Sequence, residues 1–466
     1  MKKIIMVLLL VLVIPFSGCG RTNTYINDNS LLNNEICYEI NEPERVPETT
    51  PAFNVQENPL LKPQNVVLIS AGAWHTLAVT ADGGLWAWGG SDWQRGLIGD
   101  GTNGYSLLPV RILSNVTYAV AGESHSMAIT ADGALWAWGN NHVGQIGDGT
   151  HTTPEWAADW LGIPAVDNNR LTPVKIKDNV VYVTIAPTYP NAHASYSQRS
   201  FAITADGTLW AWGENGGSIY ANISGYLGDG TNENQYLPVM ILENVVSVTP
   251  TLDGGNAITA DGAQWGWGAN WRGQVGDGTT ETRLRPVMIE AEITAPDTPE
   301  YIPLYWRRPN FELDGQGILW AWGRNIGMPY DQLQLFPPLG DGTTEYRYDP
   351  VKIMENVASF ITPFDTAYAI TKDGTLWAWG NNRMGQLGDG TTEPRLAPVK
   401  ILENVASIYP VFHEDHGFAR FVKMLALTEC GAVWAWGGGG FSEGRIGDGT
   451  REHRLYPVLI IDGRTE

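Results

Sequence analysis

Short apolar runs alternate with turn residues along most of this 466-residue chain. One unit reads YAITKDGTLWAWG, then GDGTTEPRLAPVKIL, then ENVASIYPVF, and its apolar runs are rich in Val, Ile, Trp and Tyr, which favour strands. No stretch within a unit keeps the i, i+3, i+4 spacing for the ten residues that a helix needs. The pattern predicts four short strands per unit: Pro-Val-x-Ile, Asn-Val-x-x-Val, x-Ala-Ile-Thr and Leu-Trp-Ala-Trp. An Asp-Gly pair suits a tight hairpin between the last two.

The unit is repeated. A Trp-x-Trp-Gly phrase occurs seven times, and each copy is followed by a Gly-Asp-Gly-Thr turn and then by a Pro-Val pair. The phrases begin at Trp86, Trp136, Trp210, Trp265, Trp320, Trp377 and Trp434. Self-similarity at a period of about 50 residues indicates a solenoid, a propeller or an array. Four antiparallel strands in each of seven units predict an all-β fold, the seven-bladed β-propeller.

The two ends of the repeat region predict how the propeller closes. The first unit has an Asn-Val strand but no good Pro-Val-x-Ile strand before it, whereas the last unit ends on Pro-Val-x-Ile. The C-terminal strand at 458–461 is therefore expected to complete the blade begun at Val66, which leaves no open sheet edge. The fifth unit, before Trp320, has no Asn-Val strand and is the most degraded copy.

The tryptophans are expected to be scaffold. Residues i and i+2 of a strand share a face, so Trp86 and Trp88 project together while Ala87 faces the other way. A large aromatic pair recurring in every unit is suited to packing between blades. The Asp of each Gly-Asp-Gly-Thr turn can bond the amides of its own turn. A calcium loop needs several carboxylates and a closing Glu, so no metal site is expected there.

The N-terminus predicts export. Lys2 and Lys3 precede an apolar run, which is typical of a signal peptide and too short for a spanning helix. The segment Phe16-Ser17-Gly18-Cys19 resembles the lipobox of bacterial lipoproteins. That resemblance implies cleavage after residue 18 and lipid modification of Cys19, and thus an extracytoplasmic protein anchored to a bacterial cell membrane. An ordinary signal peptide with a chance cysteine is the alternative.

The predicted domains are then the signal peptide at 1–18, a flexible polar linker at 19–63 and the propeller at 64–466. The linker is rich in Asn, Glu and Pro and lacks a sustained hydrophobic period. Three cysteines are too few for a disulfide framework, and we expect Cys37 and Cys430 to be unpaired thiols.

The net charge of the chain limits the classes of partner that we expect. The formal net charge is −21, whereas binding to nucleic acid requires a basic face. The same acidity disfavours a peripheral hold on anionic lipid, so membrane contact is expected through the lipid anchor only.

Function is expected at loop positions that vary between units. One set lies near the link between the Asn-Val and Ala-Ile-Thr strands and should surround one face of the propeller. It comprises Trp74, His75, Glu123, His125, Tyr189, His193, Tyr196, Arg199, Phe364, Asp365, Tyr368, Phe412, His413, Glu414, Asp415 and His416. Aromatic side chains with Arg, His and acids are typical of protein-binding hot spots. Ordinary loop aromatics that cover the core are the alternative, and a second set that includes Tyr226 and Trp271 lies before the Gly-Asp-Gly-Thr turns.

No nucleophile elbow, Walker loop or His-Glu-x-x-His motif is present, so neither enzymatic activity nor a cofactor is expected. His413 and His416 lack a third metal ligand of known position. The expected partner is an extracytoplasmic protein, and binding or hydrolysis of a cell-surface carbohydrate is the alternative.

The stretch AGESHSMAITADGALWAWGNNHVGQIGDGT, residues 121–150, resembles the repeat of the regulator of chromosome condensation family. The resemblance implies a seven-bladed propeller over residues 64–466. The His-Ser or His-Thr step of that repeat is kept at His75 and His125 and replaced elsewhere. The Trp-Ala-Trp-Gly and Gly-Asp-Gly-Thr phrases are also similar to those of secreted propellers that inhibit class A β-lactamases. That likeness implies a third possibility, inhibition of a secreted β-lactamase-like enzyme.

Overall fold

The computed structural model describes residues 65–90, 96–153, 164–187, 198–216, 225–271, 273–289, 309–325, 338–363, 365–415, 418–437 and 446–463. The predicted signal peptide, Cys19 and the predicted linker lie outside these residues, so the domain boundaries stay predictions. Within the described residues, no helix is long and apolar enough to cross a membrane.

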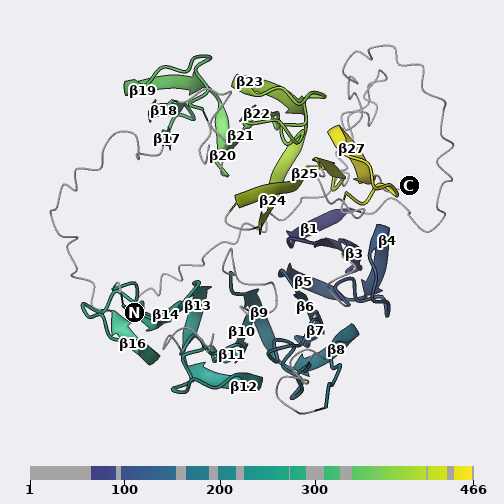
Figure 1. Cartoon of the computed structure of the whole chain (residues 1–466), viewed down its shortest axis with the longest axis vertical. Helices are drawn as coiled ribbons and strands as arrows, with labels where there is room; N and C mark the ends of the chain where they lie inside the picture. The colour runs from purple at the N-terminus through teal and green to yellow at the C-terminus, as the bar shows by residue number, and fades with distance from the viewer. Residues whose placement is uncertain are drawn as a thin grey trace, which may run out of the picture. The chain divides into compact units, whose positions relative to one another are not determined.

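The described residues form seven antiparallel sheets, six with four strands and one with three, in which strands adjacent in the sequence are paired (Figure 1). This arrangement confirms the all-β, seven-bladed propeller. The first three blades contain β1 (Val66–Ala71), β2 (His75–Thr80), β3 (Leu85–Gly89) and β4 (Ser106–Leu113); β5 (Val116–Ala121), β6 (His125–Thr130), β7 (Leu135–Gly139) and β8 (Arg170–Lys177); and β9 (Val180–Ile185), β10 (Arg199–Thr204), β11 (Leu209–Gly213) and β12 (Gln235–Leu242).

The fourth blade contains β13 (Val245–Pro250), β14 (Gly254–Thr259), β15 (Gln264–Gly268) and β16 (Arg283–Ile289). The fifth has three described strands, β17 (Asn310–Leu313), β18 (Leu319–Gly323) and β19 (Arg347–Met354), in agreement with its degraded sequence. The last two contain β20 (Val357–Ile361), β21 (Thr366–Thr371), β22 (Leu376–Gly380) and β23 (Arg395–Leu402); and β24 (Val405–Asp415), β25 (Phe418–Thr428), β26 (Val433–Gly437) and β27 (Arg454–Ile461).

The Asn of each Asn-Val pair makes the turn from one blade to the next. Asn115, Asn179, Asn244, Asn356 and Asn404 have φ between 57° and 59°, a left-handed conformation that asparagine tolerates better than most residues. At the first of these turns, Ala131 N donates to Asn115 O and Val116 N donates to Gly83 O, at 2.7 and 2.8 Å. The recurring Asn is therefore a backbone requirement.

Closure differs in one respect from the expectation. The C-terminal strand β27 pairs with β26 of its own blade, and the first blade already has β4 as its outer strand. The last and first blades meet through packing and hydrogen bonds outside the strand ladder. Val66, Ile69 and Trp88 share one apolar cluster with Leu425 and Ile461, and Val66 N donates to Gly431 O at 3.1 Å. Each Pro-Val strand thus pairs with the Trp-x-Trp-Gly strand that precedes it in the sequence, in the same blade.

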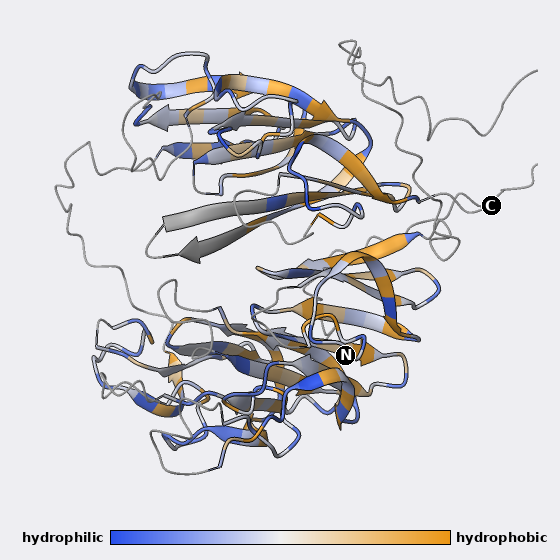
Figure 2. Cartoon of the chain, turned by 45° about the vertical axis from the view of Figure 1, so that its right-hand side comes forward, coloured by the Kyte–Doolittle hydropathy of each residue, from blue (hydrophilic) through white to orange (hydrophobic). Residues whose placement is uncertain are grey.

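The two tryptophans of each phrase have different roles. In several blades, the first tryptophan of the phrase donates its indole N–H to a threonine of its own hairpin. Trp210, for example, donates to Thr204 Oγ1 at 3.2 Å. The second one is buried against the preceding blade, as Trp436 is when its Nε1 donates to Gln386 O at 3.0 Å. The same bond to the turn of the preceding blade is made by Trp88, Trp138, Trp212, Trp267 and Trp379. In Figure 2 the strands carry orange, apolar segments between pale and blue ones.

Cys430 lies in the turn between β25 and β26 and is disulfide-bonded. The expectation of an unpaired thiol at this position is therefore wrong. Composition alone gave no sign of this bond, because three cysteines do not define a pairing pattern.

The first glycine of the Gly-Asp-Gly-Thr turn allows the close approach between blades, which yields a stability prediction. Gly388 has φ +83°, and a Cβ there would lie 2.6 Å from Trp436 Nε1. Gly390 has φ +82° but no atom near such a Cβ, so it is a matched control for backbone strain alone. We expect Gly388→Ala to lower the free energy of unfolding by about 1–3 kcal/mol more than Gly390→Ala. Urea denaturation measures both, and equal losses would contradict the proposed contact.

Candidate functional site

The structure buries four of the residues that the sequence assigned to a binding face. His75, His125 and Tyr368 are 0% exposed and Arg199 is 1% exposed. All four lie in the second strands of their blades rather than in loops. These four therefore do not belong to an accessible surface, and the sequence-based prediction is corrected for them.

The buried histidines link neighbouring blades. His75 Nε2 lies 2.6 Å from Ser126 Oγ of the second blade, and His125 Nε2 lies 2.8 Å from Ser200 Oγ of the third. Lys423 continues the series from the seventh blade, because its Nζ donates to Thr76 Oγ1 at 2.6 Å. His75 and His125, the first residues of β2 and β6, each contact the second residue of the next blade's second strand. Lys423 lies within the longer β25 at the equivalent register, since it pairs with Gly437 as His75 pairs with Gly89. Each residue of a His-Ser step thus contacts a different neighbouring blade. Ser126 contacts His75 of the preceding blade, and His125 contacts Ser200 of the following blade.

Burial sets the charge state of these histidines. It lowers the pKa of His75 to about 3, with a further contribution from the positive charge of Lys423. It lowers the pKa of His125 to about 4, although a hydrogen bond with Gln198 acts in the opposite direction. Both rings are therefore neutral at physiological pH, which suits hydrogen bonding within a dry interface.

Arg199 makes the corresponding link to the fourth blade through backbone carbonyls. Its Nη2 donates to Thr251 O at 3.2 Å and to Leu252 O at 2.7 Å, and its guanidinium lies 4.6 Å from the ring centroid of Tyr226. Burial raises the pKa of the neighbouring Glu214 to about 7, although the charge of Arg199 lowers it. Arg199 is therefore an interior cation in a packed junction, and Tyr226, from the second predicted set, is its aromatic neighbour.

The other predicted residues have mixed positions. Asp365 is half-buried and accepts a hydrogen bond from Asn381 Nδ2 at 2.6 Å, while burial raises its pKa. Trp74 and Glu123 are half-buried at the turn before the second strand. Phe412, His413, Glu414 and Asp415 lie on β24, which pairs with β25 in a hairpin of two 11-residue strands. These four are therefore on a strand and not in a loop. Tyr189, His193, Tyr196, Phe364 and His416 lie outside the described residues.

A polar cluster that the sequence did not reveal surrounds the Asp of the Gly-Asp-Gly-Thr turn. Asp389 accepts hydrogen bonds from Asn382 Nδ2 at 2.8 Å, from its own turn at Thr391 N at 3.0 Å, and from Arg395 Nε at 2.6 Å. Equivalent aspartates are bound by the Asn residues Asn141, Asn215, Asn270 and Asn325. The recurring Asn after Trp-x-Trp-Gly-x was the available signal. The carboxylate is engaged by the protein itself, and no group of three metal-ligating side chains occurs in the described part of the chain.

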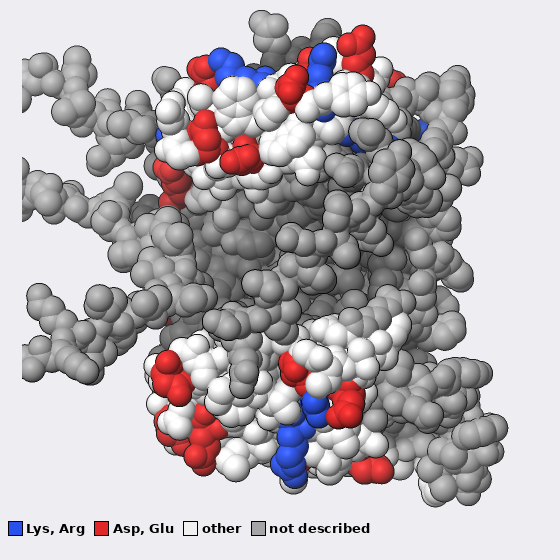
Figure 3. Space-filling model, turned by 90° about the vertical axis from the view of Figure 1, so that its left-hand side faces the viewer, with Lys and Arg blue, Asp and Glu red and all other residues white. Residues whose placement is uncertain are grey.

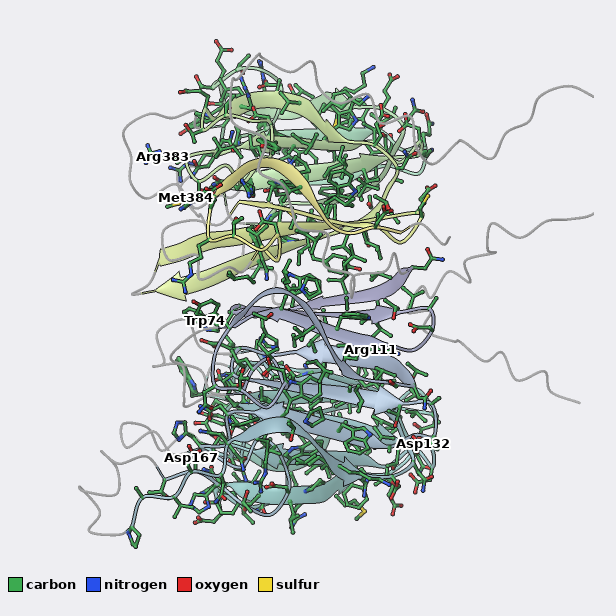
Figure 4. All side chains as sticks on the ribbon, turned by 90° about the vertical axis from the view of Figure 1, so that its right-hand side faces the viewer. Trp74, Arg111, Asp132, Asp167, Arg383 and Met384 are labelled. Carbon is green, nitrogen blue, oxygen red and sulfur yellow. The ribbon has the colours of Figure 1, made fainter. Side chains whose placement is uncertain are left out.

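Ion pairs also lie at the opposite ends of the blades, near the Asp-Gly hairpins. Lys175 and Lys352 of the outer strands pair with Asp178 and Glu355, both at 2.6 Å. Figure 3 shows acidic groups with cations interspersed on one side of the molecule, and Figure 4 shows Arg111 and Asp132 at the hairpin end and Trp74 at the other end. Both ends of the blades thus carry ion pairs, Arg–Asp pairs at the Gly-Asp-Gly-Thr turns and Lys–acid pairs near the Asp-Gly hairpins.

Comparison with known proteins is consistent with this geometry. Models of the regulator of chromosome condensation repeat match residues 66–92, 116–145 and 373–413. The chain carries regulator of chromosome condensation repeats. It is 27% identical over 278 residues to the ultraviolet-B receptor UVR8 of Arabidopsis thaliana, and the alignment covers 56% of each chain. The chain therefore spans about half the length of this relative.

Solved structures are similar at lower identity. Yeast RCC1 (Prp20), in a structure with Kap60, has a TM-score of 0.47 at 19% identity, with 90% of each chain covered. Human WBSCR16 has a TM-score of 0.43 at 20% identity, with 74% of this chain and 84% of that chain covered.

The buried histidines yield a pH prediction. Their folded pKa values of about 3 and 4 lie below the ordinary value of 6.5, so the unfolded chain binds protons first as the pH falls. Stability should therefore be fully present above pH 6.5 and decline below it, by about 1.4 kcal/mol per pH unit for each histidine. Urea denaturation from pH 7 to pH 4.5 measures this slope. The His75→Gln/His125→Gln variant should have a flatter profile, and an unchanged slope would contradict the assignment.

Proposed function

We propose that this repeat propeller is a non-enzymatic binding protein that is held outside a bacterial membrane by a lipidated Cys19 and recognises a protein partner. One observation carries the non-enzymatic part of the proposal. The His75–Ser126 and His125–Ser200 pairs have the donor–acceptor distance of an activated nucleophile. All four side chains are 0% exposed, so no substrate reaches them. The hydrogen bonds of these pairs instead join neighbouring blades.

The repeat architecture supports a protein partner. Propellers of this family are scaffolds for protein interaction, and the described strands repeat one another closely while the connecting segments differ in length and composition. A constant framework with variable connections is the arrangement by which rigid scaffolds present binding residues. The relative UVR8 is named a receptor, a role that also belongs to the binding class.

The location rests on the N-terminal sequence. Two lysines, an apolar run and the Phe16–Cys19 segment have the order of a lipoprotein signal, and the linker at 19–63 is long enough to separate the propeller from the lipid. The net charge of −21 is compatible with an anchored protein that touches the membrane only through its lipid.

The anchor is tested by Cys19→Ser in the full chain expressed in a bacterium. We expect the parent protein in the membrane pellet and the variant in the soluble fraction, because the variant lacks the acylation site. Metabolic labelling with a radioactive fatty acid gives a second readout. Retention of the variant in the pellet together with unchanged labelling would overturn the lipid anchor.

The partner class is tested by quantitative capture from the extracytoplasmic proteins of the source bacterium, with wall polysaccharide in a parallel arm. The variant carries Tyr189→Ala, Tyr196→Ala and Phe412→Ala, and the control carries Tyr348→Ala, an exposed aromatic on β19 (76% exposed). We expect affinity for one protein to fall at least about tenfold in the triple variant only. Saturable retention of polysaccharide without a protein partner would favour the carbohydrate alternative instead.

A further inference from the structure

The outer strand of each blade carries a variable residue between Val and Ile of Pro-Val-x-Ile. This residue lies directly opposite the first tryptophan of the blade, as in the pairs Trp136–Lys175, Trp210–Met240 and Trp265–Met288. Directly opposite residues of an antiparallel pair share one face of the sheet. The position is a cation in four blades, at Arg111, Lys175, Lys352 and Lys400. In the third and fourth blades it is methionine.

At the junction between the second and third blades, a lysine two residues after this position contacts a tryptophan of the next blade. Lys177, the last residue of β8, has its Nζ 3.4 Å from the centroid of the Trp210 ring. It also experiences the negative charges of Asp206 and Asp178, which raise its pKa although burial lowers it more. This junction therefore places an ammonium group on a tryptophan face beside hairpin carboxylates, a favourable cation–π arrangement.

The next junction has the same receiving groups without that ammonium. Trp265 donates its Nε1 to Thr259 Oγ1 at 3.2 Å, as Trp210 does to Thr204, and Asp261 occupies the hairpin position of Asp206. Leu242, the last residue of β12, occupies the position that Lys177 occupies at the end of β8. The result is an open groove of about 580 Å³ lined by Met240, Leu242, Glu243, Asp261 and Trp265, among others.

The groove combines exposed apolar groups with carboxylates. Met240, which lines the groove, is 55% exposed. Met288 is not a lining residue, but it is the cross-strand neighbour of the lining Trp265 and is 56% exposed. Asp261 is exposed, and its Oδ1 accepts hydrogen bonds from Thr259 and Ala263 N. Among the described residues, no ion pair is formed by Asp261 or by the exposed Glu243, whereas Asp178 at the equivalent turn pairs with Lys175. The groove thus has negative charge beside an apolar and aromatic floor.

We propose that the groove between the third and fourth blades binds a lysine or arginine side chain of the partner protein, presented by an extended segment with apolar residues beside it. The cation takes the place on Trp265 that Lys177 takes on Trp210, and Glu243 and Asp261 supply the opposite charge. The neighbouring apolar side chains contact Met240 and Met288, whose flexible thioethers adapt to varied shapes. This proposal rests on the proposed protein-binding function and specifies one surface and the chemistry of its partner.

The test is a titration of the full chain with the peptide acetyl-Leu-Lys-Leu-Lys-Leu-amide, followed through the ¹³C-labelled methyl groups of Met240 and Met288. Acetyl-Leu-Glu-Leu-Glu-Leu-amide is the charge-reversed control. The decisive variant is Leu242→Lys, which supplies the groove with the internal lysine of the preceding junction. Leu113→Lys places a lysine at the equivalent position between the first and second blades and is the matched control.

We expect saturable shifts of both methyl resonances with the lysine peptide only. Its affinity should fall at least tenfold in Leu242→Lys and in Asp261→Asn, and should not change in Leu113→Lys. Thermal unfolding of each variant verifies that it is folded. No saturable shift, equal affinity for the two peptides, or equal losses in Leu242→Lys and Leu113→Lys would overturn the groove. The capture experiment decides the binding role of the propeller separately, since a partner that binds Leu242→Lys unchanged uses another surface.

Discussion

The fold depends on one contact that recurs between blades: the second tryptophan of a blade lies against the first glycine of the preceding Gly-Asp-Gly-Thr turn and donates its indole N–H to a carbonyl there. The contact requires a glycine with positive φ on one side and a fully buried indole on the other, as at Gly388 and Trp436. Because a single four-stranded blade cannot bury its faces alone, these contacts join neighbouring sheets around shared apolar clusters. At several turns, as at Asp389, an asparagine and an arginine hold the turn aspartate and so keep the turn in the shape that receives the next tryptophan.

A second set of contacts between blades explains why polar and charged side chains are buried there. His75, His125 and Lys423 each reach a hydroxyl of the following blade, and Arg199 reaches two carbonyls. A buried polar group is costly without a partner, so these links favour one order and register of blades over alternatives. They also show why residue types associated with catalysis occur in a protein whose function we assign to its surface.

The repeat made the fold predictable from sequence, because seven copies of three landmarks specify strand number, hairpin position and the role of the tryptophans. The binding site was less predictable. His75 and His125 appear at matching positions before the Ala-Ile-Thr strands, but a strand that begins one or two residues earlier changes an exposed loop residue into a buried one. The outer-strand contrast between Lys175 and Met240 was visible in the sequence, yet its meaning required the cross-strand pairing with the tryptophans. The disulfide of Cys430 could not be derived from three cysteines without coordinates.

The central claim is that the recurring histidines join blades and do not face solvent. Modification of the native chain with diethyl pyrocarbonate, mapped by mass spectrometry, tests it most directly, with the exposed His453 as an internal reference. The structure predicts that His453 reacts readily while His75 and His125 stay unmodified until the chain is unfolded. Modification of His75 and His125 in the folded chain at the rate of His453 would contradict the account and return both residues to the surface.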